Sequence, residues 1–408
     1  MTFEQTFDSL EEYCRLNGWR GFDCYDGLNA RWLERSGLRR SRVARTLWIQ
    51  TLKRSPVNFR RLCGISPEDN PKALALFLLG LAHRGDRGNR VSWLGQIREL
   101  ADRLVDLREP GDAPGGWGYP FPWQSRAFLA PRGASNIVVT TFSGLALLTA
   151  HQCAGENRWL EAVRGACRFV ADKLVASDED GQPFFSYVEG DRSQIYNATL
   201  LGARLLVEAG TQLIEPDWVD LGLRAARVVA NAQGRDGSWT YGPRLRHRWV
   251  DSFHTGYNLM ALEAISQRLG TKEFDGAIAQ GYDFYRARFF TEDFAPRYYS
   301  TQTYPIDVHS AAVAILTFLS MNRFDALAHR WAAGVAEWTI RTMRDPTQGY
   351  FYFQKHRLYT NRIPYMRWSQ AWMYVALAAI IHGNARIPSV ARGSVEDKRG
   401  RARSVMSS

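Results

Sequence analysis

The sequence predicts an all-α protein, an (α/α)6 toroid with short β pieces in the loops at its mouth. Strongly apolar helical segments recur along the 408 residues at intervals of about 50 to 60 residues. Amphipathic segments, each with one charged face, lie between them. A helix that is apolar on all sides is buried, whereas a helix with a polar face lies at the periphery. The alternation therefore predicts an inner ring and an outer ring of six helices each.

The apolar segments share one pattern, in which a polar residue stands at the start of a helix rich in small and apolar side chains. Because these polar residues occupy equivalent repeat positions, we expect them near a common level at one end of the inner ring. They are Ser143, Asn197, Asn258, Ser310 and Gln370. The segments span residues 140–150, 194–206, 255–265, 307–319 and 367–380, with a less regular sixth member at residues 71–82.

Six amphipathic segments are expected to form the outer ring. They divide the chain into an N-terminal extension packed on the toroid (residues 1–40), the toroid itself (residues 41–384) and a tail (residues 385–408). The tail is rich in Ser, Gly and Arg, which is typical of a disordered basic end. The amphipathic segments are residues 41–54, 90–107, 157–175, 217–232, 273–290 and 323–343.

The formal net charge of +11 is mild for a domain of this size once the basic tail is set aside. No recognised nucleic-acid-binding motif accompanies the charge, so we expect no nucleic-acid partner. An acidic oligo- or polysaccharide, such as a glycan that contains uronic acids, matches a positive surface at least as well.

The N-terminal sequence and the cysteines predict a cytoplasmic protein. MTFEQTFDSLEEYC is acidic and lacks the charged stretch and apolar core of a signal peptide. The five cysteines form no CxxC pair, and an odd, scattered set indicates reduced thiols. We find no apolar run of the roughly 18–20 residues that cross a bilayer, so no transmembrane segment is expected.

The stretch RWVDSFHTGYN gathers acid–base side chains at the start of the fourth inner helix. Asp251, or the serine after it, is placed to cap the helix by accepting hydrogen bonds from free backbone N–H groups. His254, Tyr257 and Asn258 follow at helical spacing and share one face. Polar groups at the start of a buried helix are suited to form the floor of a pocket.

Asp307 and His309 repeat this arrangement at the start of the fifth inner helix. Two facing carboxyl groups, Asp251 and Asp307, would suit glycoside hydrolysis, although helix capping explains both residues equally well. Histidine and tyrosine side chains would instead suit epimerisation or elimination at a uronate, with Arg367 holding the carboxylate bidentately. The candidate catalytic residues are Asp251, His254, Tyr257, Asp307 and His309.

The loops before the inner helices are rich in aromatic residues, and flat aromatic faces suit the C–H faces of sugars. The longest such loop, residues 110–135, is either a binding loop or a structural plug. The N-terminal loop with Asp23 and Asp26 either caps a helix at Asn29 or crosses the mouth. The candidate substrate-binding residues are Trp117, Tyr119, Trp123, Tyr196, Asn197, Asn258, Tyr304, Tyr365, Arg367, Trp368 and Gln370.

Several motifs together resemble a bacterial family of toroid proteins that is encoded with exopolysaccharide-biosynthesis genes. They are GWGYPFPWQ, DGSWTYG, WVDSFHTGYN, YPIDVHSA and IPYMRWSQAWMYVALA, and the resemblance covers most of residues 15–383. More distantly, the repeats are similar to six-hairpin glycosidases, to the toroid of glucuronyl C5-epimerases and to terpene cyclases. The resemblance implies a role in polysaccharide biosynthesis, and no site residue is transferred from it.

The favoured function is a carbohydrate-active enzyme that processes an acidic glycan by hydrolysis, C5-epimerisation or elimination. We expect no cofactor and no metal, because the sequence has no HExxH motif, cysteine cluster or phosphate-binding loop. One alternative is a non-catalytic glycan-binding or scaffold subunit of a synthesis complex. Another is a terpene cyclase-like enzyme, suggested by QGRDGSW at residues 233–239, although DxDD and DDxxD motifs are missing.

Overall fold

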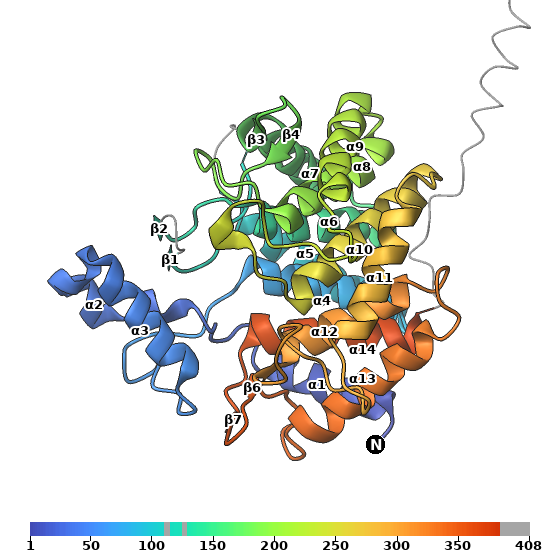
Figure 1. Cartoon of the computed structure of the whole chain (residues 1–408). Coiled ribbons are helices and arrows are strands. Elements are labelled where there is room, and N and C mark those ends of the chain that lie inside the picture. Colours follow the sequence, from blue (N-terminus) through green and yellow to red (C-terminus); the bar gives the residue numbers. More distant parts are fainter. Residues whose placement is uncertain (110–114, 125–128, 384–408) are drawn as a thin grey trace, which may run out of the picture.

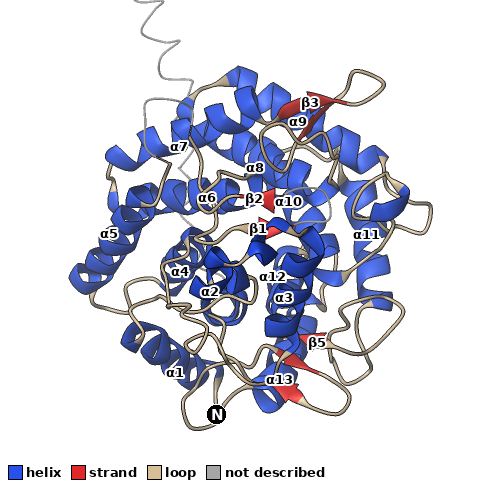
Figure 2. Cartoon of the chain, turned by 90° about the vertical axis from the view of Figure 1, so that its left-hand side faces the viewer, coloured by secondary structure: helices blue, strands red, loops and turns tan. Residues whose placement is uncertain are grey.

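The computed structural model describes residues 1–109, 115–124 and 129–383 and confirms the (α/α)6 toroid. Each inner helix packs against the next one, and the last packs against the first, so the ring is closed. Figure 2 shows the ring viewed along its axis. The inner helices are α4 (Pro71–Arg84), α6 (Ile137–Ala154), α8 (Tyr196–Leu213), α10 (Ser252–Leu269), α12 (Val308–Ser320) and α14 (Trp372–His382).

Five outer helices each follow their inner partner in the chain and pack on it. The sixth outer position is taken by the N-terminal helix α1 (Phe3–Leu16), which packs on α14 and so joins the two ends of the chain. Phe7 and Tyr374 meet there with ring centroids 4.7 Å apart. The other outer helices are α5 (Arg90–Asp106), α7 (Arg158–Arg168), α9 (Pro216–Asn231), α11 (Asp275–Arg288) and α13 (Ala328–Met343).

The expectation that residues 41–54 form the first outer helix is wrong. They do form a helix, α3 (Arg42–Arg54), but it packs on short turns at Asp26–Asn29 and Gly37–Arg40 and beside strand β1 (Trp123–Gln124). With α2 (Arg31–Arg35) it builds a separate small core of Leu28, Ala30, Leu33, Ile49, Leu52 and Ile65. We call residues 26–65 the N-terminal projection. It stands out from the barrel in Figure 1 and lies over the mouth of the ring in Figure 2.

The small residues of the inner helices allow close helix packing. A Cβ atom at Gly256 of α10 would lie 2.7 Å from Val313 and Thr317 of α12. A Cβ atom at Gly80 of α4 would lie 2.4 Å from the Tyr374 ring of α14. Such contacts are too short for any side chain, so the ring closes tightly only with glycine at these positions.

Helix α6 is the most apolar element, and every residue from 137 to 150 is buried. Of the helices that the structure describes, it is the one whose length and composition would allow it to cross a membrane. The expectation that no apolar run reaches this length is therefore wrong. Within the fold, 78% of the run is buried in the barrel, which is the position of a core helix.

The inner helices begin at the mouth, and four of them start with a capping side chain. Asn70, Asn136, Asp251 and Asp307 each accept a hydrogen bond from a backbone N–H group of the first turn. The last inner helix begins instead with a π-helical segment, Met366–Ala371, which leads directly into α14. The first turns of these helices therefore collect at one end of the ring.

Short strands occur in the loops that precede inner helices, as predicted. Two antiparallel pairs and one three-stranded sheet in the order β5-β6-β7 are formed. The remaining strands are β2 (Leu129–Ala130), β3 (Val175–Ser177), β4 (Pro183–Phe185), β5 (Ile306–Asp307), β6 (Gln354–Lys355) and β7 (Thr360–Asn361). The predicted tail, residues 385–408, lies outside the described residues.

Candidate active site

The start of α10 holds a carboxylate–imidazole pair. Oδ1 of Asp251 caps the helix by accepting from the backbone N–H of His254 at 3.0 Å, and Oδ2 lies 2.7 Å from Nδ1 of the same ring. A carboxylate accepts, so Nδ1 carries the proton and Nε2 presents a lone pair. Among the described residues, no hydrogen-bond partner of Nε2 is found, and the His254 side chain is 22% exposed. This is the arrangement of a general base whose tautomer is fixed by a carboxylate.

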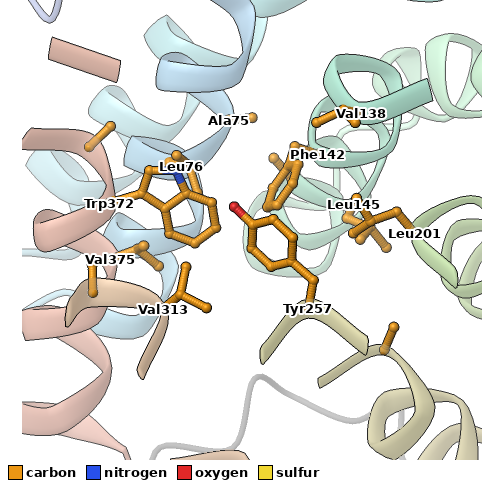
Figure 3. Packing of buried hydrophobic residues seen from close by; sticks show 14 of the residues in the cluster. Ala75, Leu76, Val138, Phe142, Leu145, Leu201, Tyr257, Val313, Trp372 and Val375 are labelled. Atoms are coloured by element: carbon orange, nitrogen blue, oxygen red, sulfur yellow. The ribbon is translucent and has the colours of Figure 1, made fainter. Parts of the chain in front are cut away.

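Tyr257, one turn further along α10, reaches the centre of the ring. Its hydroxyl lies 2.6 Å from Nε2 of His309 on α12. Burial raises the pKa of Tyr257 well above its usual value and lowers the pKa of His309 well below its own. The hydrogen bond therefore joins a neutral tyrosine hydroxyl and a neutral imidazole. Figure 3 shows Tyr257 between Phe142 and Trp372, and its ring centroid lies 5.6 Å from that of Trp372.

Lys72, on the first turn of α4, is a buried lysine that the sequence analysis missed. Its Nζ lies 4.3 Å from the centroid of Phe142, 5.3 Å from that of Trp372 and 5.6 Å from that of Tyr257. Within the described residues it makes no hydrogen bond or ion pair. Burial, followed by the positive charge of Arg367, lowers the pKa of Lys72 well below its usual range. A buried amine without an anionic partner is costly and marks a functional group.

Arg367 is held by Asp23, a residue of the N-terminal loop. Its Nη2 donates to Oδ1 of Asp23 at 2.8 Å and its Nε donates to the other oxygen, and both side chains are buried. The guanidinium also lies 5.0 Å from the ring of Tyr119 and 5.2 Å from that of Trp368. The expectation that Arg367 is available for a substrate carboxylate is therefore wrong in this conformation, because Asp23 fills its fork.

A second buried ion pair lies within the N-terminal projection, and its arginine contacts the mouth. Arg60 donates from Nε to Oδ1 of Asp26 at 2.6 Å, and burial raises the pKa of Asp26 to about 7 in spite of this partner. The guanidinium of Arg60 lies 4.6 Å from the ring of Tyr365, so Tyr365 supports this pair rather than facing a pocket. Of the two interpretations of the N-terminal loop, helix capping at Asn29 is not observed, and the contribution of carboxylates to the site stays a prediction. Asn29 caps no helix, since Ala30 occupies the cap position of α2.

Asp307 is a structural residue in this conformation. It is fully buried, and its oxygens accept from Gln354 Nε2 at 2.6 Å, Trp368 Nε1 at 2.9 Å and the backbone N–H of His309 at 2.9 Å. These donors engage both oxygens, and the expected role of Asp307 as a catalytic carboxylate stays a prediction. The capping interpretation is supported.

Two further predicted binding residues are also structural. Trp117 is fully buried, and its Nε1 donates to the backbone oxygen of Leu104 at 2.7 Å, so it does not lie over the mouth. The amide of Gln370 exchanges two hydrogen bonds of 2.8 Å with the backbone of Phe351. Both were predicted from composition and repeat position. These do not distinguish a side chain that packs inside the fold from one that faces the pocket.

The other predicted binding residues are spread around the mouth. Trp123 packs on Tyr187 with ring centroids 5.0 Å apart, and Tyr304 is partly exposed in the loop before α12. Tyr196, Asn197 and Asn258 are buried on α8 and α10, and both asparagine Oδ1 atoms lack a hydrogen-bond partner.

Two aromatic residues beside His254 were not predicted. The rings of Tyr241 and Trp249 stack with their centroids 4.5 Å apart and an interplanar angle of 18°. The centroid of the Tyr241 ring lies 4.8 Å from that of the His254 ring. Trp249 also donates from Nε1 to Asp251 Oδ2 at 3.2 Å. They form an aromatic wall next to the exposed imidazole, and their place in the DGSWTYG and RWVDSFH motifs is the signal that could have identified them.

The QGRDGSW turn has a packing role. Gln233 donates to the backbone oxygens of Gly237 and Ala277, and the buried Trp239 donates to that of Val229. These contacts join α9 to α11 on the outer side of the barrel, away from the ring centre. Among the described residues, no cluster of three or more His, Cys, Asp or Glu side chains is suited to hold a metal ion.

Comparison of the sequence with protein-family models and with curated proteins gives no match. Solved structures share the fold at low identity. A cellobiose 2-epimerase from Bacillus thermoamylovorans superposes with a TM-score of 0.63 at 8% identity, over 77% of this chain and 88% of that chain. An unsaturated glucuronyl hydrolase specific for heparin superposes with a TM-score of 0.57 at 14% identity, over 78% of this chain and 88% of that chain. A GH76 alpha-mannanase from Bacteroides thetaiotaomicron superposes with a TM-score of 0.57 at 14% identity, over 76% of this chain and 86% of that chain. The predicted likeness to six-hairpin glycosidases is thus confirmed at the level of the fold.

Proposed function

We propose that the protein is a carbohydrate-active enzyme that moves a proton on an acidic glycan, by epimerisation or elimination at C5 of a uronic acid. The observation that carries this proposal is the Asp251–His254 pair, whose Nε2 is unpartnered among the described residues. A base of this kind removes the C5 proton, which the neighbouring carboxylate makes acidic. Return of a proton to the opposite face inverts C5, whereas loss of the C4 substituent gives an unsaturated uronate.

Hydrolysis is less well supported, because it requires two available carboxyl groups beside the scissile bond. Asp307 is engaged by three donors, and Asp251 is bound to His254 and to Trp249. Asp23 and Asp26 are each paired with an arginine. The carboxyl groups near the ring centre therefore hold other side chains in place, and an imidazole remains as the accessible base.

An anionic substrate is supported by the charge at the ring centre. Lys72 and Arg367 bring basic side chains to the ring centre, and their charge adds to burial in lowering the pKa of His309. Helix N-termini of the inner ring add partial positive charge at the same end. Lys72 has no anion of its own, so it is placed to neutralise the charge that develops when C5 loses its proton.

The fold relatives support a saccharide as substrate, since their names describe epimerases and hydrolases of sugars. The resemblance of the motifs to proteins of exopolysaccharide gene clusters suggests a bacterial polysaccharide or its precursor. We also propose that the reaction takes place in the cytoplasm, where the five free cysteines would stay reduced. Finding the native protein outside the cell would contradict this placement.

Incubation with oligoglucuronate and oligomannuronate in D2O is expected to replace C5 hydrogen by deuterium. Proton NMR would show loss of the C5–H signal together with inverted or 4,5-unsaturated residues. Formation of new reducing ends without exchange at C5 would identify a hydrolase. Binding without any chemical change, equal in wild type and His254→Ala, would identify a glycan-binding subunit.

Lys72→Met is expected to lower activity by at least about tenfold without lowering the free energy of unfolding. Methionine fills the space of the lysine stem and removes a buried amine that has no anionic partner, so the fold loses nothing. Activity and denaturant unfolding measure the two effects. Lys272→Met, at an exposed position of the α10–α11 turn, is the control. A variant that unfolds easily but keeps full activity would make Lys72 a structural residue.

A further inference from the structure

The net positive charge of the protein is concentrated in the N-terminal projection. Residues 26–65 contain ten Lys or Arg and two acidic residues, Asp26 and Glu34, so the projection carries a net charge of +8 out of the +11 of the chain. The barrel beneath it is close to neutral. A basic segment that stands apart from a neutral body is typical of a surface that binds an anionic partner.

The projection also exposes large apolar side chains. On α3, Ile49 and Leu52 face the small core, whereas Val43 and Leu47 point outward and are 67% and 63% exposed. In the loop that follows, Leu62 is 85% exposed, and Val57 and Phe59 are also exposed. Within the part of the chain that the structure describes, these outward side chains remain largely exposed, so they form an apolar surface on the projection.

The β6–β7 hairpin extends this surface. Its tip is fastened to the end of α3, because Tyr359 donates from its hydroxyl to the backbone oxygen of Arg54 at 3.2 Å. Asn361 donates to the backbone oxygens of Lys53 and Ser55. Between these anchors Leu358 is 92% exposed. A fixed hairpin therefore presents one more apolar side chain next to the basic end of α3.

Basic and exposed aliphatic side chains on one element are the combination that binds an anionic lipid surface. Arginine and lysine are attracted to the headgroups, while leucine, valine and phenylalanine enter the boundary with the acyl chains. A soluble acidic glycan would account for the charge, but aliphatic side chains gain nothing against its hydroxyl groups. We propose that the N-terminal projection docks the protein on an anionic phospholipid bilayer as a peripheral protein.

Docking in this way orients the barrel. The projection lies over the mouth of the ring (Figure 2), so the mouth faces the bilayer. The projection is joined to the mouth by the contact of Arg60 with the ring of Tyr365, and the adjoining loop is joined to it by the Arg367–Asp23 pair. The catalytic end would therefore be held towards saccharides carried at the membrane surface.

Sedimentation of the full-length protein with vesicles tests this proposal. Binding is expected to vesicles of equal phosphatidylglycerol and phosphatidylcholine and not to phosphatidylcholine alone. The variant Leu47→Gln/Leu62→Gln should bind at least about tenfold more weakly, because two largely exposed leucines lose their transfer into the lipid boundary. Arg54→Gln/Arg61→Gln should lose about fivefold per charge removed.

The control variant Ile214→Gln/Lys272→Gln changes an exposed apolar and an exposed basic residue on the α8–α9 and α10–α11 turns and should bind as wild type. All proteins retain the basic tail, so differences between them report on the projection. Equal binding of all variants, or equal binding to neutral vesicles, would overturn the proposal. So would a dimer in sedimentation velocity that Leu47→Gln/Leu62→Gln dissociates, since the surface would then pair two copies of the chain. Affinity for oligoglucuronate that falls in the arginine variant, without vesicle binding, would assign the surface to the glycan.

Discussion

His254→Ala and Asp251→Asn are expected to lower kcat on an acidic glycan by roughly 10²–10⁴-fold. His254→Ala removes the proposed base. Asp251→Asn keeps a good helix cap but no longer fixes the imidazole tautomer, since its side-chain N–H₂ would face Nδ1. Steady-state kinetics and thermal denaturation of both variants measure the two consequences.

Both melting temperatures are expected to stay close to that of the wild type. The His254 side chain is partly exposed, and asparagine caps helices about as well as aspartate. His329→Ala, at an exposed histidine of the outer helix α13, is the matched control and should change neither quantity. Full activity in both site variants, or unfolding of both, would show that the pair is structural.

Asp23→Asn is expected to lower the free energy of unfolding by about 3–5 kcal/mol. Removal of the carboxylate leaves the buried guanidinium of Arg367 without its partner, and an uncompensated buried charge is strongly destabilising. Denaturant unfolding measures the effect. Glu12→Gln, which breaks the exposed ion pair with Arg15, is the control and should cost less than about 1 kcal/mol.

The double variant Asp23→Asn/Arg367→Leu should recover part of this loss, because both charged partners are then removed. If Asp23→Asn is instead as stable as the wild type and binds oligoglucuronate more tightly, Asp23 competes with the substrate for Arg367. The original expectation that Arg367 binds a substrate carboxylate would then be restored.

The toroid could be predicted because inner helices are apolar on all sides and therefore leave a signal in the local sequence. The assignment of outer helices failed at the N-terminus for a related reason. Helices α1 and α3 are both amphipathic, and periodicity shows that a helix has an apolar face without showing which surface covers it. Spacing favoured residues 41–54, whereas the actual partner of α14 lies at the other end of the chain.

In the candidate site, too, contacts within one helix could be predicted from the sequence, whereas contacts between distant segments could not. Asp251 and His254 are three residues apart on one helix, so their contact was accessible from spacing alone. The pair of Asp23 and Arg367 spans 344 residues, and no local pattern connects them. Lys72 was missed because a lysine at the start of a helix normally extends into solvent. Only the closed ring shows that this helix start is buried.

The pairing of α1 with α14 has a consequence for the synthesis of the chain. The hydrogen bond between Glu11 and Tyr374 can form only after the 363 residues that separate them have been synthesised. At the usual speed of translation, this delay is about 20 to 70 s. During that time Phe7, Leu10 and Cys14, all buried in the finished protein, lack the cover that α14 provides. The nascent chain therefore presents the apolar face of its amphipathic N-terminal helix to chaperones throughout elongation, and the ring is completed only after the last helix has left the ribosome.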